Sequence, residues 1–205
     1  AARLQGRAIP FFKPRPREEV LERIHAAVAA GCPAVGMDID AAAFVTMRSR
    51  GQAVGPKSVA ELRSIIKACP VPFIVKGVMT PRDAQAALKA GAKALIVGNH
   101  GGRTMDHMPG GADVLPAIAR AVRGRVPIIL DGGVRSGEDV LKALALGADL
   151  CMIGRPVAIA AIGGLADGVS LYWRDLREQL ERAMILTGTK NVRKVDARIL
   201  VQTPA

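Results

Sequence analysis

The stretch Val71-Pro72-Phe73-Ile74-Val75-Lys76-Gly77 decides the fold class, because the chain repeats it further on as Val126-Pro127-Ile128-Ile129-Leu130-Asp131-Gly132. Each copy is a short apolar run that ends in a charged residue and a glycine, as buried parallel strands often do. A further glycine, Gly31, Gly91 or Gly147, precedes three of the apolar runs. Such a glycine permits the left-handed conformation that ends a helix before a strand. The recurrence predicts repeated strand–helix units.

Apolar runs and helical patterns alternate along the rest of the chain. We predict strands at Ala34–Ile39, Phe73–Lys76, Ala94–Gly98, Ile128–Asp131 and Leu150–Gly154, with a weaker one at Arg7–Phe12. We predict helices at Pro16–Ala30, Ser58–Ala68, Pro81–Ala90, Ala112–Val122, Gly137–Leu146 and Val169–Thr187. Ser58, Thr80 and Ser136 are the predicted N-caps. This alternation is typical of α/β proteins and favours a (β/α)8 TIM barrel, with an open doubly wound sheet as the alternative.

Six strands do not close a barrel of eight. We therefore expect about six of the eight βα units, with the two others belonging on the N-terminal side. The chain, 1–205, would form a single partial barrel domain. Its first residue is Ala1 rather than Met, so we expect a processed, tagged or partial chain.

Composition narrows the class of protein. The net charge is +11, but Lys and Arg are scattered without an arginine-rich run or interleaved aromatic residues, so we expect no nucleic-acid partner. No apolar run reaches the ~20 residues of a membrane span, and no signal-peptide pattern is present. Cys32, Cys69 and Cys151 are far apart and lack metal-ligand spacing. We expect reduced thiols in a cytoplasmic protein without a metal or a membrane span.

Polar groups follow five successive predicted strands. They are Asp40, Lys76, Asn99–Arg103, Asp131–Arg135 and Gly154–Pro156. Any one of them could be ordinary: a strand-end lysine often reaches for solvent, and an aspartate often caps a turn. In a barrel, however, the carboxyl ends of the strands meet at the rim that carries the chemistry. The set therefore predicts a functional site at this rim.

The residue types suit two tasks. Gly132, Gly133 and Gly154 leave backbone N–H groups open to an anion, and Arg135 and Arg155 add charged donors, which predicts a phosphate site after the last two strands.

The second task is acid–base chemistry. His100 can accept a proton near neutral pH, and a carboxylate such as Asp40 can orient it. Arg103 can hold a substrate carboxylate, and Lys76 places a fixed positive charge where a reduced cofactor gathers electron density.

These segments resemble the FMN-dependent α-hydroxy-acid oxidising enzymes, the glycolate oxidase and lactate oxidase family. The resemblance is carried by Ile74–Gly77, Asn99–Asp106, Asp131–Gly137, Lys142–Ala148 and Ile153–Pro156. Asn99-His100-Gly101-Gly102-Arg103 is the most specific of them. The resemblance implies a tetrameric or larger homo-oligomer that oxidises a small-molecule 2-hydroxy acid to a 2-oxo acid and reduces FMN.

The resemblance also implies residue roles. His100 would take a proton from the substrate hydroxyl or α-carbon, Asp40 would partner His100, and Arg103 would clamp the carboxylate. The residues implied for FMN are Lys76, Gly98, Asp131, Gly132, Gly133, Val134, Arg135, Gly154 and Arg155.

The chain departs from the family pattern in four places. Pro10 aligns with a tyrosine that assists substrate binding in the family. Asp38 stands where a threonine is common, and Gly98 where a serine is common. Arg48 and Arg50 follow Asp40 without aligning with the family's second carboxylate-binding arginine. These changes leave the flavin site intact and put short substrates such as lactate or glycolate in doubt.

Two other functions stay open. An inosine-monophosphate-dehydrogenase-like barrel would have similar phosphate turns but needs a catalytic cysteine loop, and neither Cys69 at a helix end nor Cys151 inside a strand fits one. The other is a barrel that binds a flavin or phosphate without catalysis.

Overall fold

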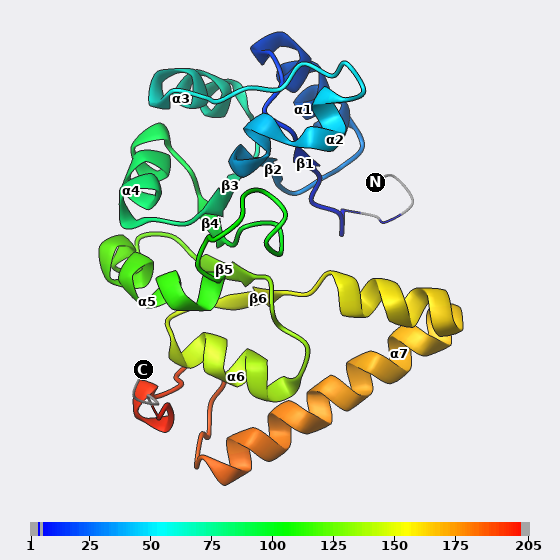
Figure 1. Cartoon of the computed structure of the whole chain (residues 1–205), viewed down its shortest axis with the longest axis vertical. Coiled ribbons are helices and arrows are strands. Elements are labelled where there is room, and N and C mark those ends of the chain that lie inside the picture. Colours follow the sequence, from blue (N-terminus) through cyan, green and yellow to red (C-terminus); the bar gives the residue numbers. More distant parts are fainter. Residues whose placement is uncertain (1–3, 5, 202–205) are drawn as a thin grey trace.

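The computed structural model describes residue 4 and residues 6–201. Its six strands form one parallel sheet in chain order, as the staves of a barrel do. They are β1 Phe11–Phe12, β2 Val35–Asp38, β3 Phe73–Val78, β4 Ala94–Val97, β5 Ile128–Asp131 and β6 Leu150–Met152. Figure 1 shows them through the centre of the molecule with the helices around them. The predicted fold class is confirmed: the chain forms six βα units of a (β/α)8 barrel.

The helices connect the strands on the outside of the sheet. They are α1 Arg17–Ala29, α2 Val45–Arg48, α3 Val59–Ala68, α4 Pro81–Ala90, α5 Gly111–Val122, α6 Gly137–Ala145 and α7 Arg155–Leu186, with short 3-10 turns η2 at Ile39–Ala43 and η3 at Ala197–Ile199. All three predicted N-caps are confirmed. Ser58 and Ser136 form capping boxes with Glu61 and Asp139, and the Thr80 side chain accepts a hydrogen bond from the backbone N–H of Asp83.

The sheet has two differently filled faces. Its outer face packs against the helices in the large core that includes Val35, Val75 and Leu95. Its inner face carries a small cluster of Ala34, Ile74 and Ile96, with Phe11 and Ile129 packed beside it. Because side chains alternate along a strand, the residue two positions after each inner one also faces inward.

Several element bounds differ from the predicted ones. β1 covers Phe11–Phe12 rather than Arg7–Phe12, and β6 ends at Met152 rather than Gly154. The largest correction concerns α7, predicted at Val169–Thr187, which begins at Arg155. Pro156 suits the first turn of a helix, where no N–H is needed, so it starts a helix here. Helices α2, η2 and η3 were not predicted.

α7 is bent, with two arms in Figure 1. Gly164 and Leu165 have non-helical backbone angles, and Leu165 has a φ of 48°. By length and composition alone, α7 could cross a membrane, and none of its most apolar window is buried. Length and composition are weak evidence for a membrane span, and the kink at Gly164 and Leu165 interrupts the helix. The absence of a membrane span therefore stays a prediction.

The sheet has two open edges. In the described part of the chain, β1 pairs only with β2 and β6 only with β5. Leu150 and Met152 on β6 are 58% and 36% exposed. A closed barrel would pair its first and last strands, so these two edges mark where the six units stop.

Candidate active site

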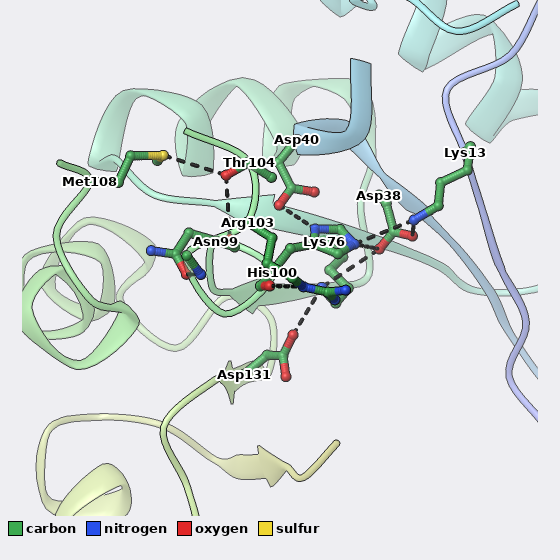
Figure 2. A network of polar contacts seen from close by, with 11 residues as sticks. Lys13, Asp38, Asp40, Lys76, Asn99, His100, Arg103, Thr104, Met108 and Asp131 are labelled. Atoms are coloured by element: carbon green, nitrogen blue, oxygen red, sulfur yellow. Dashed lines mark hydrogen bonds and ion pairs between the residues drawn. The ribbon is translucent and has the colours of Figure 1, made fainter. Parts of the chain in front are cut away.

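The strand period of two explains which side chains converge at the carboxyl ends. Phe11, Ile74 and Ile129 face the interior, so Lys13, Lys76 and Asp131 do so one step closer to the rim. Asp38 is in register with Lys76 across β2 and β3. The four charges alternate in sign around the inner rim, and Figure 2 shows them beside His100.

His100 and Asp40 form the tightest contact of the rim. His100 Nδ1 lies 2.6 Å from Asp40 Oδ2, and the two side chains are only 10% and 9% exposed. An ionised carboxylate can only accept a hydrogen bond, so Nδ1 donates, and in the neutral imidazole Nε2 then carries the lone pair. The structure therefore brings the predicted base and its predicted partner together, with Nε2 on the side of the ring away from Asp40 (Figure 2).

The loop after β4 holds His100 in an unusual conformation, with a φ of 54°. The Asn99 side chain fixes this turn: its Oδ1 accepts a hydrogen bond from the backbone N–H of Gly102 at 2.9 Å, and its Nδ2 donates to the Pro109 carbonyl at 2.9 Å. The buried Asn99 thus sets the direction of the imidazole.

Asp40 in turn lies directly over the backbone of Gly77. A Cβ at Gly77 would lie 2.4 Å from the Asp40 carboxyl carbon, and Gly77 has a φ of +96°. Only glycine therefore fits there. Asp40 Oδ1 is buried without a hydrogen-bond partner among the described residues, so His100 is the only side chain in this region that hydrogen-bonds to the carboxylate.

The remaining rim charges form two ion pairs. Lys13 Nζ lies 2.8 Å from Asp38 Oδ2, and Lys76 Nζ lies 2.9 Å from Asp131 Oδ2. Lys76 also lies 3.7 Å from Asp38 Oδ1, which links the pairs. Ligand atoms of Asp38, Asp40 and His100 lie within 4.8 Å of one another, as in a metal site. Two ammonium groups already balance the charge of Asp38, so these residues do not require a cation.

The sequence reasoning missed Lys13, and its alignment of Pro10 with the family's tyrosine stays a prediction. Pro10 precedes β1, where its carbonyl accepts a hydrogen bond from Gly36 at the amino end of the strand. Lys13 follows β1 and reaches the rim. The signal that finds it is its spacing of two from Phe11. Arg48 and Arg50 are exposed around α2, and among the described residues neither hydrogen-bonds to His100 or Asp40.

An open cavity of about 880 Å³ lies between this cluster and the glycine turns. It is lined by Phe11, Asp38, Lys76, His100, Gly101, Arg103, Asp131, Gly132, Gly133, Val134, Arg135, Met152, Gly154, Arg155, Pro156, Ile159, Ala160 and Tyr172. Most of the predicted site residues thus share one cavity. Asp40 and Gly98 do not line it: Asp40 lies behind His100, and a Cβ at Gly98 would meet the Asp131 carbonyl oxygen at 2.5 Å.

The glycine turns suit a phosphate group. Gly132 and Gly133 have φ values of +99° and +83°, and space is open where a Cβ would stand at either residue and at Gly154. α7 begins at Arg155, so the unpaired N–H groups of its first turn lie at the cavity. Arg155 and Arg135 are exposed, and in the described part of the chain neither guanidinium pairs with a carboxylate. The site therefore fits a ligand that carries a phosphate.

Two cavity residues complete the lining. Arg103 Nε donates to the His100 carbonyl at 2.9 Å, and its guanidinium lies 6.0 Å from the centre of the Phe44 ring. Tyr172, which the sequence reasoning missed, comes from α7 and donates its hydroxyl hydrogen to the Arg135 carbonyl at 3.1 Å. Burial raises the pKa of Tyr172, with a smaller effect from Asp139, so the phenol stays a neutral donor.

An oriented histidine lies at this barrel rim beside Gly132, Gly133, Gly154, Arg135 and Arg155, here called the phosphate cradle, and the arrangement is typical of cofactor-dependent barrel enzymes. The profile of the family described as FMN-dependent dehydrogenase matches residues 46–202, and the chain belongs to this family. The family's cofactor is FMN.

Individual relatives support this membership. The chain is 49% identical over 139 residues to a 2-hydroxyacid oxidase of Dictyostelium discoideum, covering 68% of this chain and 35% of that protein. It is 48% identical over 144 residues to an L-lactate oxidase of Lactobacillus jensenii, covering 70% and 35%. It is 38% identical over 174 residues to human 2-hydroxyacid oxidase 1, covering 82% and 45%. The chain thus spans less than half the length of these relatives.

A solved structure of mandelate oxidase superposes on 93% of the chain with a TM-score of 0.85 and 30% identity, and the match covers 63% of that structure. The fold of the six units is therefore that of the matching part of a 2-hydroxy-acid-oxidising barrel.

Proposed function

We propose that the protein binds FMN in the cavity and oxidises a 2-hydroxy acid to a 2-oxo acid. The observation that carries the proposal is His100: Asp40 holds its Nδ1 at 2.6 Å, and the ring lines the same cavity as the phosphate cradle. When bound, FMN supplies the acceptor for the two electrons that the substrate loses.

The chain's own residues divide the work. His100 Nε2 accepts a proton from the substrate hydroxyl or α-carbon, and Asp40 stabilises the imidazolium that forms. Arg103 binds the substrate carboxylate from the mouth of the cavity. Gly132, Gly133 and Gly154 offer backbone N–H groups to the phosphate.

The other residues proposed for the cofactor act by charge. Arg135 and Arg155 neutralise the phosphate. Lys76, fixed by Asp131 at 2.9 Å, holds a positive charge near the flavin ring. Val134 and Asp131 line the cavity between these groups, and Gly98 acts indirectly, by letting Asp131 approach.

We further propose a cytoplasmic homo-oligomer without a nucleic-acid partner. The three cysteines are free and Cys32 is buried, which suits a reducing compartment. Exposed apolar residues on the first arm of α7, Ile159 at 69% and Ile162 at 85%, would suit a contact between copies of the chain.

The test is spectroscopic. The purified protein is expected to show flavin absorption bands, to release FMN on denaturation, and to lose the bands when a 2-hydroxy acid is added without oxygen. A panel from glycolate to mandelate would define the acid. A protein that neither contains nor takes up FMN contradicts the proposal, and one that binds FMN but is bleached by no member of the panel would be a binding module.

A further inference from the structure

Lys13 is the charged group nearest to the proton-accepting nitrogen of His100. Its Nζ lies 3.4 Å from His100 Nε2, and this contact joins β1 to the loop after β4. Three groups fix the ammonium there: Asp38 Oδ2 at 2.8 Å, the Phe44 ring at 5.3 Å from its centre, and the imidazole itself. Figure 2 shows Lys13 and Asp38 on the side of the ring opposite Asp40.

The anchoring is strong for a lysine. The Asp38 side chain is only 7% exposed and that of Lys13 27%, so the pair is shielded from water on one side and open on the other. Phe44 also stacks on His100, with ring centres 5.2 Å apart, so one aromatic ring positions both the base and the ammonium.

This geometry fixes what a substrate must meet. A group that gives its proton to Nε2 has to lie about 3 Å from it. The α-oxygen of a hydroxy acid in that position is within hydrogen-bond reach of an ammonium that is itself 3.4 Å from Nε2. Lys13 carries three N–H donors, of which Asp38 uses one, so another can bind the α-oxygen while the Nε2 lone pair takes the proton.

We propose that Lys13 binds the α-oxygen of the substrate and of its 2-oxo product, as a substrate-contacting residue separate from the carboxylate contact of Arg103. The proposal rests on the proposed function. When the hydroxyl O–H bond breaks and the proton moves to Nε2, the oxygen gains negative charge beside the Lys13 ammonium, which keeps its own protons. Asp38 is then a positioning residue that holds Lys13.

The experiment compares acids that differ only in the α-oxygen. Dissociation constants are measured for pyruvate against propionate and for benzoylformate against phenylacetate, from the change that each causes in the flavin absorption of the FMN-loaded protein. Lys13→Met is expected to weaken the oxo acids about 10- to 100-fold, the range of a hydrogen bond from a charged donor. It should change the affinity for propionate and phenylacetate by about twofold or less. Arg103→Met should weaken both members of each pair.

Two further variants guard against a folding defect. Lys13→Gln keeps a donor for Asp38 and should lose most of the same discrimination, and Lys13→Arg should regain part of it. Lys93→Met, an exposed lysine at the opposite end of the sheet, is the matched control and should change nothing.

The outcomes separate the two proposals. If Lys13→Met and Lys13→Gln weaken both members of each pair equally, or neither, Lys13 does not contact the α-oxygen. If the wild-type protein takes up FMN and is bleached by a hydroxy acid, the proposed function stands whatever the lysine variants do. A wild-type protein that binds neither FMN nor any of the four acids overturns both.

Discussion

The two halves of the cavity are built in opposite ways. On the side of β1 to β4, Asp38, Asp40 and Lys76 are nearly buried, and each charge meets an opposite one or the imidazole. On the side of β5 and β6, the wall includes Gly132 and Gly133 in positive-φ conformations and Arg135 and Arg155, which are exposed.

The contrast follows from the two tasks of the cavity, proton transfer and phosphate binding. A base must be oriented before the substrate arrives, so its partners are packed around it. A phosphate brings its own charge and acceptors, so its site can consist of donors that stay unsatisfied until it binds. If the tasks are separate, a change in one half should leave the other half working.

His100→Ala should remove the base and leave the cradle unchanged. The rate of flavin reduction by the best hydroxy acid is expected to fall about 10²- to 10⁴-fold, the usual contribution of general base catalysis. The FMN dissociation constant should stay within about threefold of wild type, because no cradle residue changes. Stopped-flow reduction without oxygen and fluorescence titration of FMN give the two numbers. A comparable loss of FMN affinity would show that the halves depend on each other.

The double variant Arg135→Met with Arg155→Met should do the reverse. Losing two charged donors is expected to raise the FMN dissociation constant about 10²- to 10³-fold. At saturating FMN, the reduction rate should remain near that of wild type. Arg82→Met, an exposed arginine at the start of α4, is the control for loss of surface charge. FMN affinity that survives the double variant would place the phosphate elsewhere.

Gly77→Ala should disturb the base side through the backbone. The new Cβ would meet the Asp40 carboxyl group at 2.4 Å, in addition to the strain of a φ of +96°. A loss of about 1–3 kcal/mol in unfolding free energy is expected, together with slower flavin reduction.

Gly124→Ala separates the effect of backbone strain from that of a steric clash with a neighbouring side chain. Gly124 also has a positive φ, +68°, but its Cβ would meet nothing within 4 Å. Its loss of stability should be about 1 kcal/mol, without an effect on reduction. Urea denaturation of both variants measures the difference; equal losses would mean that Asp40 moves aside freely.

The reactivity of the Cys151 thiol tests whether β6, the strand beside the phosphate cradle, opens to solvent. Burial raises the pKa of Cys151 from 9.0 to about 11, with a smaller contribution from Asp139. The thiol therefore stays protonated at pH 8, and iodoacetamide should label it about 100-fold more slowly than an unhindered thiol. Because the unfolded chain ionises first, this thiol should lower stability as the pH rises from 9 to 11. Labelling followed by peptide mass analysis is the measurement; rapid labelling at pH 8 would mean that β6 opens.

Much of the cavity could be predicted because parallel strands end at one rim. Lys76, Asp131 and His100 follow recognisable apolar runs, so their convergence needed only the barrel. The N-caps of α3, α4 and α6 were readable because Ser58, Thr80 and Ser136 act within one helical turn.

The missed features depend on contacts between distant segments. β1 is only two residues long, too short for a visible alternation, so Lys13 was overlooked. The bend of α7 brings Tyr172 to the Arg135 carbonyl, a contact between residues 37 apart in the sequence that no local pattern encodes. Gly98 was assigned to the cofactor from the family resemblance, which stays a prediction, and its close approach to the Asp131 carbonyl oxygen could not be foreseen.

The open edges of the sheet determine which strands should exchange their amide hydrogens fastest. β3 and β4 are paired on both sides, whereas β1 and β6 each have one side without a strand in the described chain. In hydrogen–deuterium exchange, the amides of β3 and β4 should therefore be protected longest, and those of β1 and β6 should exchange through local opening at a lower free-energy cost. Lys13 follows the more labile end of this gradient and His100 follows its most protected part. The contact between them thus joins a slow-exchanging strand to a fast one, and protection of β1 should rise when an acid occupies the cavity.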